Sequence, residues 1–314
     1  MTRRQRQGQL GWTCAMVFAI FAAQGVAQEN NAQSMALIPA GIFVMGDSFD
    51  EGEDMEQPVR EVELDAFRMD RYPVTKALWD KVHDWAIRNG YEFDHPGRGK
   101  EKDHPVVEVS WHDALKWCNA RSEMQGRTPA YYTDADQSEV YRSGAVELSN
   151  DGVRWDAGYR LPTEAEWERA AGGDGDRRRF PWGDTIDHER ANYWANSRAH
   201  AYDASGQARW TYHPDYEDGP HPYTSPVGSF EAGPHGLHDM AGNVWEWCWD
   251  WYAPYSGKKE SNPRGPDSGW ARVIRGGGWN AGAHNCRVAS RYGNWPGRGG
   301  QSLGFRTVLP EESK

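Results

Sequence analysis

The stretch that most constrains this chain carries a tryptophan at every second position. It reads GLHDMAGNVWEWCWDWY over residues 236–252, and its tryptophans alternate with Glu246, Cys248 and Asp250. A period of two is the period of a β-strand, whose successive side chains point to opposite faces of a sheet. The pattern therefore predicts a strand with one face buried under aromatic rings. The tryptophans are Trp245, Trp247, Trp249 and Trp251.

The residues just before this strand place side-chain oxygens around a flexible glycine. Asp239, Asn243 and Glu246 flank Gly242. Backbone loops of this composition wrap hard cations, because carboxylate and carbonyl oxygens are the ligands that calcium prefers. We therefore expect a loop with a cation-binding composition to lead into the tryptophan strand.

Composition narrows the fold class and excludes one class of partner. The mean hydropathy is -0.88, and the 314 residues include 17 Trp, 14 Tyr and 35 Gly. Such a chain builds its core from rings more than from aliphatic side chains and is rich in loops. Its length permits one large domain or two ordinary ones. The net charge of -11 argues against a nucleic-acid-binding surface, which needs a basic footprint.

The N-terminal segment has the organisation of an export signal. Several arginines precede a short apolar run over 13–23, and small residues at 25–27 suit a cleavage site. The apolar run is short for a bilayer span. We expect residues 1–27 to be a signal peptide and 28–34 a short linker. The mature protein would then be periplasmic or extracellular, without a stable membrane anchor; an uncleaved anchor is the alternative.

Beyond this segment the cysteines are Cys118, Cys248 and Cys286. An odd number in an exported protein implies one disulfide with one buried thiol, or no disulfide at all. We favour a bridge between Cys248 and Cys286, with Cys118 as a core thiol inside a predicted helix. No two cysteines have C-x-x-C spacing, which argues against a structural zinc site.

Local patterns predict short strands and a few helices around long loops. The segment 70–75 is expected to cap the first helix, and Thr163 is the expected N-cap of the third, with Glu166 in the capping-box position. Because no βαβ repeat is present, the predicted class is α+β. The predicted helices are 75–89, 110–124 and 163–171. The predicted strands are a pair over 35–46 broken by a turn at 39–41, then 59–69, 106–109, 272–275, 286–291 and 304–306, with an inserted hairpin region over 128–159.

Two regions lack a regular pattern. Residues 47–57 form an acidic run, which favours a solvated loop over a site for a cation or a basic substrate. Beyond Ala171 periodicity nearly disappears, and long loops inside a compact domain need something to hold them. In an exported protein, bound calcium could hold these loops in place. The alternative is that packed tryptophan and proline rings hold them.

Taken together, eight strings of the sequence occur in the order found in the formylglycine-generating, sulfatase-modifying factor family. They span about residues 35–309, so the chain resembles this family over nearly its whole length. The resemblance implies one domain, assigned to residues 35–310, with a C-type-lectin-like fold, little regular secondary structure and calcium-stabilised loops. The strings are IPAGIFVMG, DAFRMDRYPVT, HPVVEVSWHDA, GYRLPTEAEWERAA, FPWGD, HDMAGNVWEW, RVIRGGGW and GFR.

The resemblance fails at the position where the family binds copper. In its formylglycine-generating enzymes, a cysteine pair after an Arg-Gly-Gly-Ser strand binds copper and activates oxygen to oxidise a sulfatase cysteine. Here Gly278 replaces the serine and Ala281 replaces the first cysteine. The second position falls in the loop 282–285, which has no thiol, and Cys286 is alone. One thiolate does not make a two-sulfur site, so copper-dependent cysteine oxidation is not expected.

The family's calcium positions match better. By resemblance, both loops would coordinate through oxygen atoms alone, as calcium requires. In each loop, some of these oxygens are backbone carbonyls. The first loop consists of Asp239, Gly242, Val244 and Glu246. The second consists of Asn192, Tyr193, Asp218 and Pro220.

Iron is left open. The sulfoxide-synthase branch of the family resembles this chain in the same domain, but it takes iron ligands partly from an N-terminal helical domain that we do not find in this sequence. His235, His238 and His284 could approach a cleft. A facial iron site needs two histidines and a carboxylate that converge, and sequence spacing does not establish that.

Three functional hypotheses follow. The first is an exported enzyme or accessory oxidase of the family without the copper cysteines, acting in a cleft lined by Trp279, Asn280, His284 and Arg291. The second is a non-catalytic module that binds a peptide, protein or glycan in a tryptophan-rich groove. The third is a nonheme metal-dependent oxidase. The family implies an oxidoreductase, and the missing cysteine pair leaves enzymatic activity open.

Overall fold

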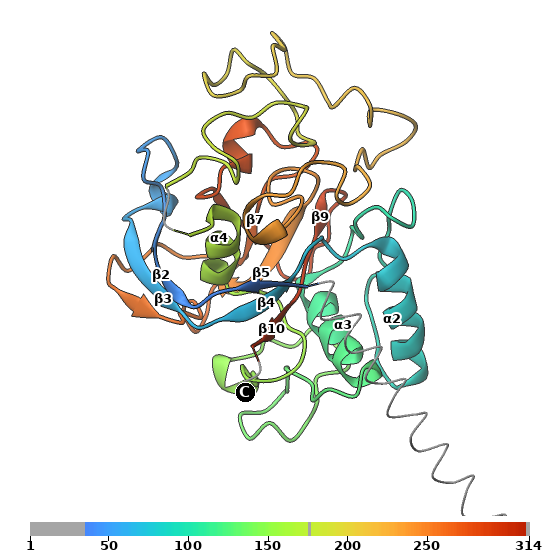
Figure 1. Cartoon of the computed structure of the whole chain (residues 1–314). Helices are drawn as coiled ribbons and strands as arrows, with labels where there is room; N and C mark the ends of the chain where they lie inside the picture. Colours follow the sequence, from blue (N-terminus) through green and yellow to red (C-terminus); the bar gives the residue numbers. More distant parts are fainter. Residues whose placement is uncertain (1–34, 175–176, 312–314) are drawn as a thin grey trace, which may run out of the picture. The chain divides into compact units, whose positions relative to one another are not determined.

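A computed structural model describes residues 35–174 and 177–311, with short helices and strands joined by long loops (Figure 1). The chain from Ala36 onward groups into one compact unit. The helices are α2 (Lys76–Arg88), α3 (Trp111–Met124) and α4 (Glu164–Gly172), with 3-10 turns η1 (Asp54–Glu56), η2 (Asn150–Gly152), η3 (Pro234–Gly236) and η4 (Ala283–Cys286). The strands are β1 (Met35–Ile38), β2 (Gly41–Met45), β3 (Arg60–Leu64), β4 (Phe67–Asp70), β5 (Trp245–Trp251), β6 (Glu260–Ser261), β7 (Arg272–Arg275), β8 (Arg291–Asn294), β9 (Leu303–Gly304) and β10 (Val308–Pro310).

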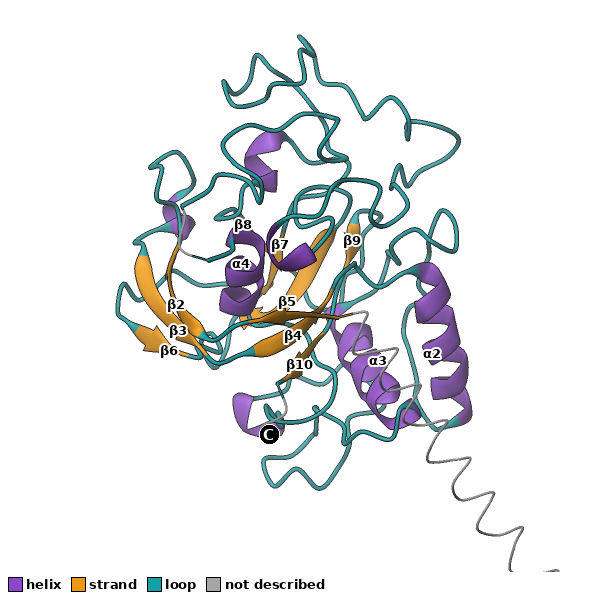
Figure 2. Ribbon diagram, viewed as in Figure 1, coloured by secondary structure: helices purple, strands orange, loops and turns teal. Residues whose placement is uncertain are grey.

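Three small sheets organise the described chain (Figure 2). The largest has the strand order β8-β7-β5-β9, with β5 antiparallel to β7 and parallel to β9. The other two have the orders β1-β4-β10 and β2-β3-β6. Helices α2 and α3 lie side by side, with the stacked rings of Trp79 and Trp117 5.9 Å apart between them. The arrangement is α+β, as predicted.

The tryptophan strand β5 is the predicted strand, but it is buried on both faces. On the tryptophan face, the indole nitrogen of Trp111 donates to the carbonyl oxygen of Cys248 at 2.9 Å, and its ring lies 5.3 Å from that of Trp249. On the opposite face, helix α4 donates the indole N–H of Trp167 to Glu246 at 2.8 Å. The predicted burial of the tryptophan face is confirmed, and the opposite face is buried as well, because α4 packs against it.

The predicted helices are confirmed by their caps. Thr75, Ser110 and Thr163 each accept a hydrogen bond from a backbone N–H in the first turn of the helix that follows. In α4 the Glu166 carboxylate also accepts the N–H of Thr163 at 2.8 Å, which completes the capping box. These signals are local, and a cap needs only residues within one turn of each other.

Several strand predictions need correction. The segment 35–46 does form two strands, but β1 pairs with β4 and β2 pairs with β3, so they are not a hairpin. The segment 59–69 is divided into β3 and β4. In 106–109 and 128–159 the described structure holds isolated bridges and no extended strand. Residues 283–286 form the turn η4, and β8 begins at Arg291. In each case pairing depends on partners far away in the sequence.

The expected disulfide is not formed. Cys118, Cys248 and Cys286 are all free thiols and all buried. Cys248 packs in the core cluster under α4, with Trp167 and Val273, whereas Cys286 packs in a separate cluster. The two thiols therefore belong to different parts of the core, which the alternation of the sequence could not indicate.

The predicted signal peptide and linker lie outside the described residues. Among the described helices, none has the length and apolar character needed to cross a bilayer. Between α4 and β5, the residues that the structure describes form loops, and η3 is the one short helical turn among them. This agrees with the loss of periodicity in that part of the sequence.

Candidate functional site

An open cleft lies over one end of the central sheet, on its tryptophan face. Its volume is about 710 Å³, and each of the four strands contributes a side chain to its floor. Tyr292 of β8 is directly opposite Ile274 of β7, and Trp245 of β5 is directly opposite Leu303 of β9. Because side chains alternate between the faces of a sheet, these residues share one face. The floor of the cleft is therefore apolar and largely aromatic.

The walls of the cleft are polar and come from three irregular segments. The acidic loop contributes Glu51 and Glu53, the long loop before β5 contributes His200, and the turn η4 contributes His284. Polar residues at the end of β8 and beyond it line the remaining side. They are Asn294, Arg298 and Ser302. The acidic segment predicted as a solvated loop therefore borders the cleft with two exposed carboxylates.

The acidic loop is held in shape by a buried aspartate. Asp47 is 2% exposed, and its carboxylate accepts the backbone N–H groups of Phe49 at 2.9 Å, Glu51 at 2.7 Å and Gly52 at 2.7 Å. Burial raises the pKa of Asp47, but these hydrogen bonds and the Arg287 guanidinium outweigh it and lower the pKa overall. The carboxylate is therefore ionised and structural.

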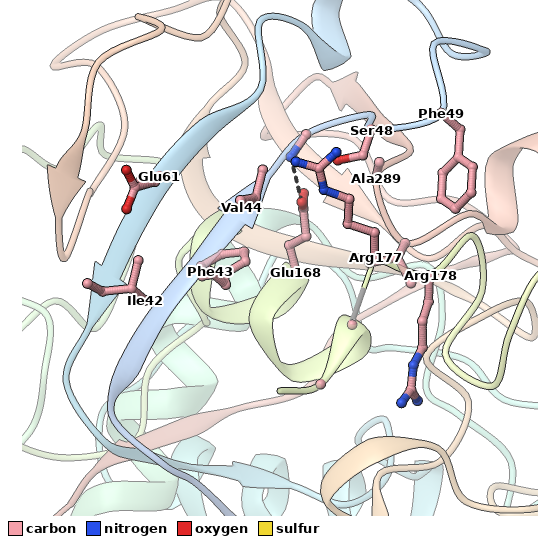
Figure 3. Close-up of a pocket in the computed structure, with 14 residues that line it drawn as sticks. Ile42, Phe43, Val44, Ser48, Phe49, Glu61, Glu168, Arg177, Arg178 and Ala289 are labelled. Carbon is pink, nitrogen blue, oxygen red and sulfur yellow. Dashed lines mark hydrogen bonds between the residues drawn. The ribbon is translucent and has the colours of Figure 1, made fainter. Parts of the chain in front are cut away.

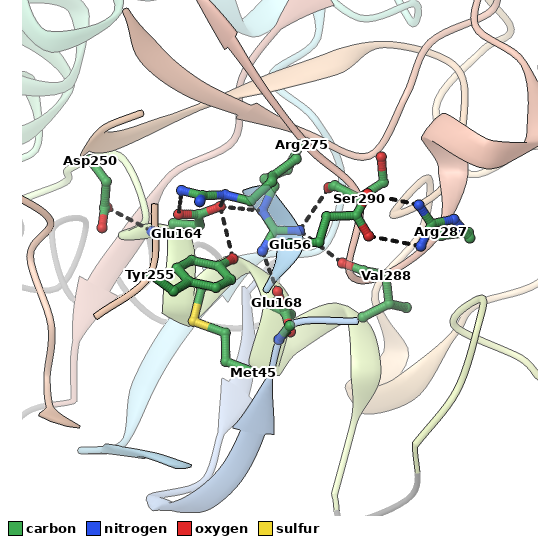
Figure 4. Close-up of polar contacts among 12 residues, drawn as sticks. Met45, Glu56, Glu164, Glu168, Asp250, Tyr255, Arg275, Arg287, Val288 and Ser290 are labelled. Atoms are coloured by element: carbon green, nitrogen blue, oxygen red, sulfur yellow. Dashed lines mark hydrogen bonds and ion pairs between the residues drawn. The ribbon is translucent and has the colours of Figure 1, made fainter. Parts of the chain in front are cut away.

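A buried network of ion pairs fixes the backbone beneath the cleft (Figure 4). The Arg275 guanidinium pairs with Glu164 at 3.0 Å and with Glu168, both on α4. It also donates to the carbonyl oxygens of Val288 at 2.9 Å and Ser290 at 2.7 Å, which lie between η4 and β8. One arginine thereby ties the helix to the segment that carries the wall of the cleft.

Two further arginines of this segment are held in the same way. Arg287 makes two hydrogen bonds, of 2.8 and 2.7 Å, to the carboxylate of Glu56 in the acidic loop. Arg291 makes two hydrogen bonds, of 2.7 and 2.6 Å, to Glu164. Such two-pronged pairs are directional as well as strong. They set the distance between the acidic loop, the turn η4 and helix α4.

The glycine run after β7 allows a close approach of backbone and side chains. Gly276 and Gly277 have positive φ angles of 92° and 72°, in the region that other residues rarely adopt. A Cβ atom on Gly277 would lie 2.8 Å from the sulfur of Cys286, and one on Gly278 would lie 3.3 Å from Cδ1 of Trp245. These glycines therefore let the backbone approach another segment closely.

The structure brings two of the four predicted cleft residues to the cleft with usable side chains. Asn280 is exposed and His284 is half-buried, and both line it. Arg291 also borders it, but its guanidinium is committed to Glu164 and to the carbonyl oxygens of Met55 and Ala253, and the residue is 3% exposed. Arg291 therefore has a structural role, because an arginine that is already paired with a carboxylate presents little charge to a ligand.

Trp279 is not in the cleft. It is 2% exposed, its indole nitrogen donates to the carbonyl oxygen of Gln301 at 3.1 Å, and its ring packs on Tyr212 and Tyr223 at 5.6 and 5.3 Å. Sequence reasoning instead missed His200 and Tyr292 as cleft residues. Tyr292 is next to the buried Arg291 in β8, and successive side chains of a strand point to opposite faces. A strand prediction that included residue 292 would therefore have placed Tyr292 on the face opposite to Arg291. Nothing local to His200 indicates its place.

The residue that the resemblance aligns with the family's first copper cysteine carries no thiol. Ala281 lines the cleft, whereas Cys286 is fully buried among Phe180, Ile186 and Tyr193 and does not belong to the lining. Burial raises the pKa of the Cys286 thiol, so it is protonated at neutral pH. A buried, protonated thiol is a poor nucleophile and a poor metal ligand.

The first predicted calcium loop contains one feature that fits a cation. Asp239 accepts the N–H of Gly228 at 2.8 Å through Oδ2, while its Oδ1 is buried without a hydrogen-bond partner among the described residues. Burial raises the pKa of Asp239. The fourth residue of this set, Glu246, is already engaged by Arg306 and Trp167. An ion at this loop would therefore share Glu246 with Arg306, and Asp239 would be its least committed ligand.

The second predicted calcium set is spread over different environments. Asn192 is 1% exposed and donates its amide to the carbonyl oxygen of Tyr223 at 2.8 Å. Asp218, in contrast, is at the surface and pairs with Lys100. The same ammonium group also donates to the carbonyl oxygens of Tyr216 and Asp218, each at 3.2 Å. A lysine thus holds the Asp218 oxygens that the prediction gave to calcium.

Histidines and carboxylates are also dispersed. Among the described residues, no group of three or more His, Cys, Asp or Glu side chains is placed to hold a metal ion. His238, predicted as able to approach the cleft, bonds the carbonyl oxygen of Phe230 at 2.9 Å and stacks on Tyr72. His235 lies near Asp174 at 3.9 Å. Neither lines the cleft.

A smaller pocket of about 250 Å³ lies between the edge strand β2 and the end of α4 (Figure 3). Phe43 and Val44 of β2 line it, together with Glu168 and Arg177. The Glu168 carboxylate is fixed there, because it accepts the N–H of Gly46 at 2.7 Å and pairs with Arg275. The larger cleft over the central sheet is therefore the better candidate for a functional site.

Comparison with known proteins agrees with this architecture. A family model described as the sulfatase-modifying factor enzyme 1-like domain matches residues 21–310. The formylglycine-generating enzyme of Thermomonospora curvata is 37% identical over 307 residues, covering 88% of this chain and 94% of that protein. The formylglycine-generating enzyme of Streptomyces coelicolor is 35% identical over 311 residues, covering 89% and 90%.

A solved structure gives the same result for the fold. The Treponema denticola variable protein 1 superposes with a TM-score of 0.67 at 28% identity, covering 88% of this chain and 95% of that one. The C-type-lectin-like formylglycine-generating fold expected from the sequence is confirmed by this likeness and by the family match. The chain belongs to the sulfatase-modifying factor family.

Proposed function

We propose that this protein is an exported member of the family that does not perform copper-dependent cysteine oxidation and that holds a peptide or glycan ligand in the cleft over its central sheet. The observation that carries the proposal is the side chain of Ala281. It lines the cleft where the family's enzymes place a copper cysteine, and Cys286, the nearest thiol in sequence, is buried away from it. Two sulfur ligands cannot be assembled from these residues.

The cleft itself supports a binding role. Its floor presents Trp245 and Tyr292, whose ring centroids are 6.1 Å apart, and Tyr292 is 59% exposed. Aromatic rings supply a large contact area at little conformational cost, and polar side chains around them supply direction. Asn280 and Arg298 are exposed polar groups of this kind. An extended chain with polar and ring-contacting groups would match such a surface.

Calcium would act as a structural ion under this proposal. Asp239, Gly242, Val244 and Glu246 would hold it, and the unpartnered Oδ1 of Asp239 supports that assignment. The ion would fix the loop that leads into β5 and thereby the position of Trp245. The second oxygen set is less suited, because Lys100 already neutralises Asp218.

The test compares oxidation with binding. The full chain would be loaded with copper and incubated with a cysteine-containing sulfatase peptide, and aldehyde formation would be followed by mass spectrometry. The Thermomonospora curvata relative would serve as the positive control. We expect no aldehyde above the copper-only background, and turnover comparable to the control would refute the proposal.

Binding would be measured on a peptide and glycan array with the unmodified chain and with Tyr292→Ala. A ligand that binds the former and loses at least tenfold in affinity with the latter would support the cleft as the site. Tyr212→Ala is a matched control, because Tyr212 packs on the buried Trp279 and does not line the cleft. Equal losses in both variants would argue against a cleft-bound ligand.

A nonheme metal-dependent oxidase is the second candidate function. One observation favours it: the wall of the cleft holds two neighbouring histidine rings to which the described residues give no hydrogen bond. Oxygen consumption by the iron-loaded chain in the presence of a cleft ligand would distinguish this candidate from a purely binding role.

A further inference from the structure

Two histidines from distant parts of the chain meet in the wall of the cleft. His200 lies in the long loop before β5 and His284 in the turn η4. Their ring centroids are 5.1 Å apart, with an angle of 39° between the ring planes. Both side chains line the cleft of about 710 Å³. Neither belongs to the framework of ion pairs beneath it.

The nitrogens of these two rings are unused. No hydrogen bond of either imidazole is present among the described residues, and Nδ1 of His284 is buried without a partner. A buried polar atom without a partner costs free energy, and it points to a group that the protein itself does not supply. A solvent-exposed pair would satisfy its nitrogens with bulk water, whereas this ring nitrogen is shielded.

Another histidine pair shows what a purely structural arrangement looks like in this protein. His188 and His213 have ring centroids 4.8 Å apart with a 42° tilt, nearly the same geometry. Their nitrogens, however, are taken: His188 bonds the carbonyl oxygen of Tyr193 at 3.2 Å, and His213 bonds that of His188 at 2.7 Å. The pair at the cleft therefore differs in having ligand atoms to offer.

Burial and a nearby cation disfavour the protonated form of both rings. Burial and the Arg287 cation lower the pKa of His200, and burial, His200 and Arg287 lower the pKa of His284. Neutral imidazole is the form that binds metal ions. The Arg287 charge is itself balanced by Glu56, to which it makes two hydrogen bonds.

We propose that His200 and His284 form a two-nitrogen site for a borderline transition-metal ion such as Zn²⁺, with its remaining coordination positions open to the cleft. With metal–nitrogen bonds of about 2.0–2.1 Å and tetrahedral angles, two imidazoles on one ion have ring centroids roughly 5 Å apart. The observed spacing of 5.1 Å matches that arrangement. Nitrogen donors suit zinc, copper and nickel better than calcium or magnesium.

An ion held by two protein ligands has room for donors from a bound molecule. Because no third His, Cys, Asp or Glu is placed to complete a metal site among the described residues, the open positions belong to water or to a ligand in the cleft. The ligand class is then one with a thiolate, carboxylate or imidazole group. This extension to the ligand rests on the proposed function; the metal site itself does not.

The site is tested first without any ligand. The full chain would be stripped of metal, kept in excess Ca²⁺ to occupy oxygen sites, and titrated with Zn²⁺ by calorimetry and with Co²⁺ by visible spectroscopy. We expect one equivalent of ion to bind, and both His200→Gln and His284→Gln to weaken it at least tenfold. His188→Gln is the matched control and should bind as the unmodified chain does. Thermal unfolding of each variant verifies that the fold is retained.

Three results would overturn the metal site. They are no binding of either ion, unchanged binding in both His200→Gln and His284→Gln, and an equal loss in His188→Gln. The ligand extension has its own test, in which N-acetylcysteine amide is added to the Co²⁺-loaded chain. A sulfur-to-cobalt charge-transfer band that His200→Gln abolishes is the expected result. Metal binding without this band would leave the metal site standing and refute the thiolate ligand class.

Discussion

Arg306 and Glu246 form a two-pronged ion pair in the centre of the protein, with Nε to Oε2 and Nη2 to Oε1 distances that are both 2.7 Å. Both side chains are at most 1% exposed. The same guanidinium donates to the carbonyl oxygen of His238 at 2.9 Å and to that of Asp70 at 3.1 Å. The pair therefore joins the tryptophan strand, the loop before it and β4.

Removing Arg306 should destabilise the protein strongly. In Arg306→Met the Glu246 carboxylate would remain buried without its cation, and the loss of one partner of a buried pair costs about 3–5 kcal/mol. We expect the midpoint of urea unfolding to fall accordingly. The double variant Glu246→Gln/Arg306→Met should recover part of the loss, because no charge is then left unpaired. A single variant as stable as the unmodified chain would contradict this account.

Calcium removal should lower thermal stability through Asp239. An ion that binds only the folded state raises stability in proportion to the logarithm of its concentration, so a chelator should reduce the unfolding temperature. Asp239→Asn should bind the ion more weakly and show a smaller effect of the chelator. Asp218→Asn is the matched control, since Lys100 occupies that carboxylate, and it should respond as the unmodified chain does. Identical responses of all three proteins would exclude Asp239 as a ligand.

The stability of the protein should fall as the pH rises through the range in which Asp250 titrates. Asp250 is buried, and its burial and the neighbouring Glu164 raise its pKa from 3.8 to about 7. The folded state therefore holds a proton that the unfolded state has lost between about pH 4 and pH 7. This contribution is complete below about pH 4 and is lost as the pH passes about 7.

The variant Asp250→Asn removes this dependence. A shift of about three pKa units corresponds to roughly 4 kcal/mol, which is an upper limit for the gain of the variant over the unmodified chain at about pH 8. The asparagine oxygen can still accept the N–H of Glu164, which the aspartate accepts at 2.7 Å. Urea unfolding at several pH values between about 4 and 8 measures the slope. If the unfolding free energies of the two proteins changed with pH in parallel, Asp250 would not be the source of the pH dependence.

A side chain on Gly277 should destabilise the wall of the cleft. Gly277→Ala combines a positive φ of 72° with a Cβ atom 2.8 Å from the Cys286 sulfur, so strain and overlap add. We expect a loss on the order of 2–4 kcal/mol. Gly90→Ala is the control for strain alone, because Gly90 has a φ of 82° and no neighbouring atom within 4 Å of the position that a Cβ would take. Similar losses in both variants would show that the contact with Cys286 is unimportant.

The sequence was most informative where a few neighbouring residues decide the structure. The helix cap at Thr163 is such a case, since a side-chain oxygen and a backbone N–H three residues later complete it. The strand β5 is another case. Only a β-strand places alternating tryptophan and polar side chains on opposite faces, so the alternation alone indicates a strand. Family membership also followed from the order of local strings.

The site was only partly predictable. Asn280 and His284 line the cleft as expected, but Arg291 turns to Glu164 and Trp279 is buried. An arginine next to a cleft can face a ligand or a carboxylate behind it, and the sequence does not say which carboxylate lies within reach. The expected disulfide failed for the same reason, because Cys248 and Cys286 belong to different core clusters.

By itself, the sequence determined the α+β class, the helices, the tryptophan strand and the absence of a cysteine at position 281. Only the tertiary structure decided the pairing of Glu246 with Arg306, the burial of β5 on both faces and the meeting of His200 with His284. A helix cap depends on hydrogen bonds between residues within one turn. The alternation of a strand depends on the direction of successive side chains. Ion pairs and ring contacts depend on which distant segments pack together, and long loops leave that choice to the folded chain as a whole.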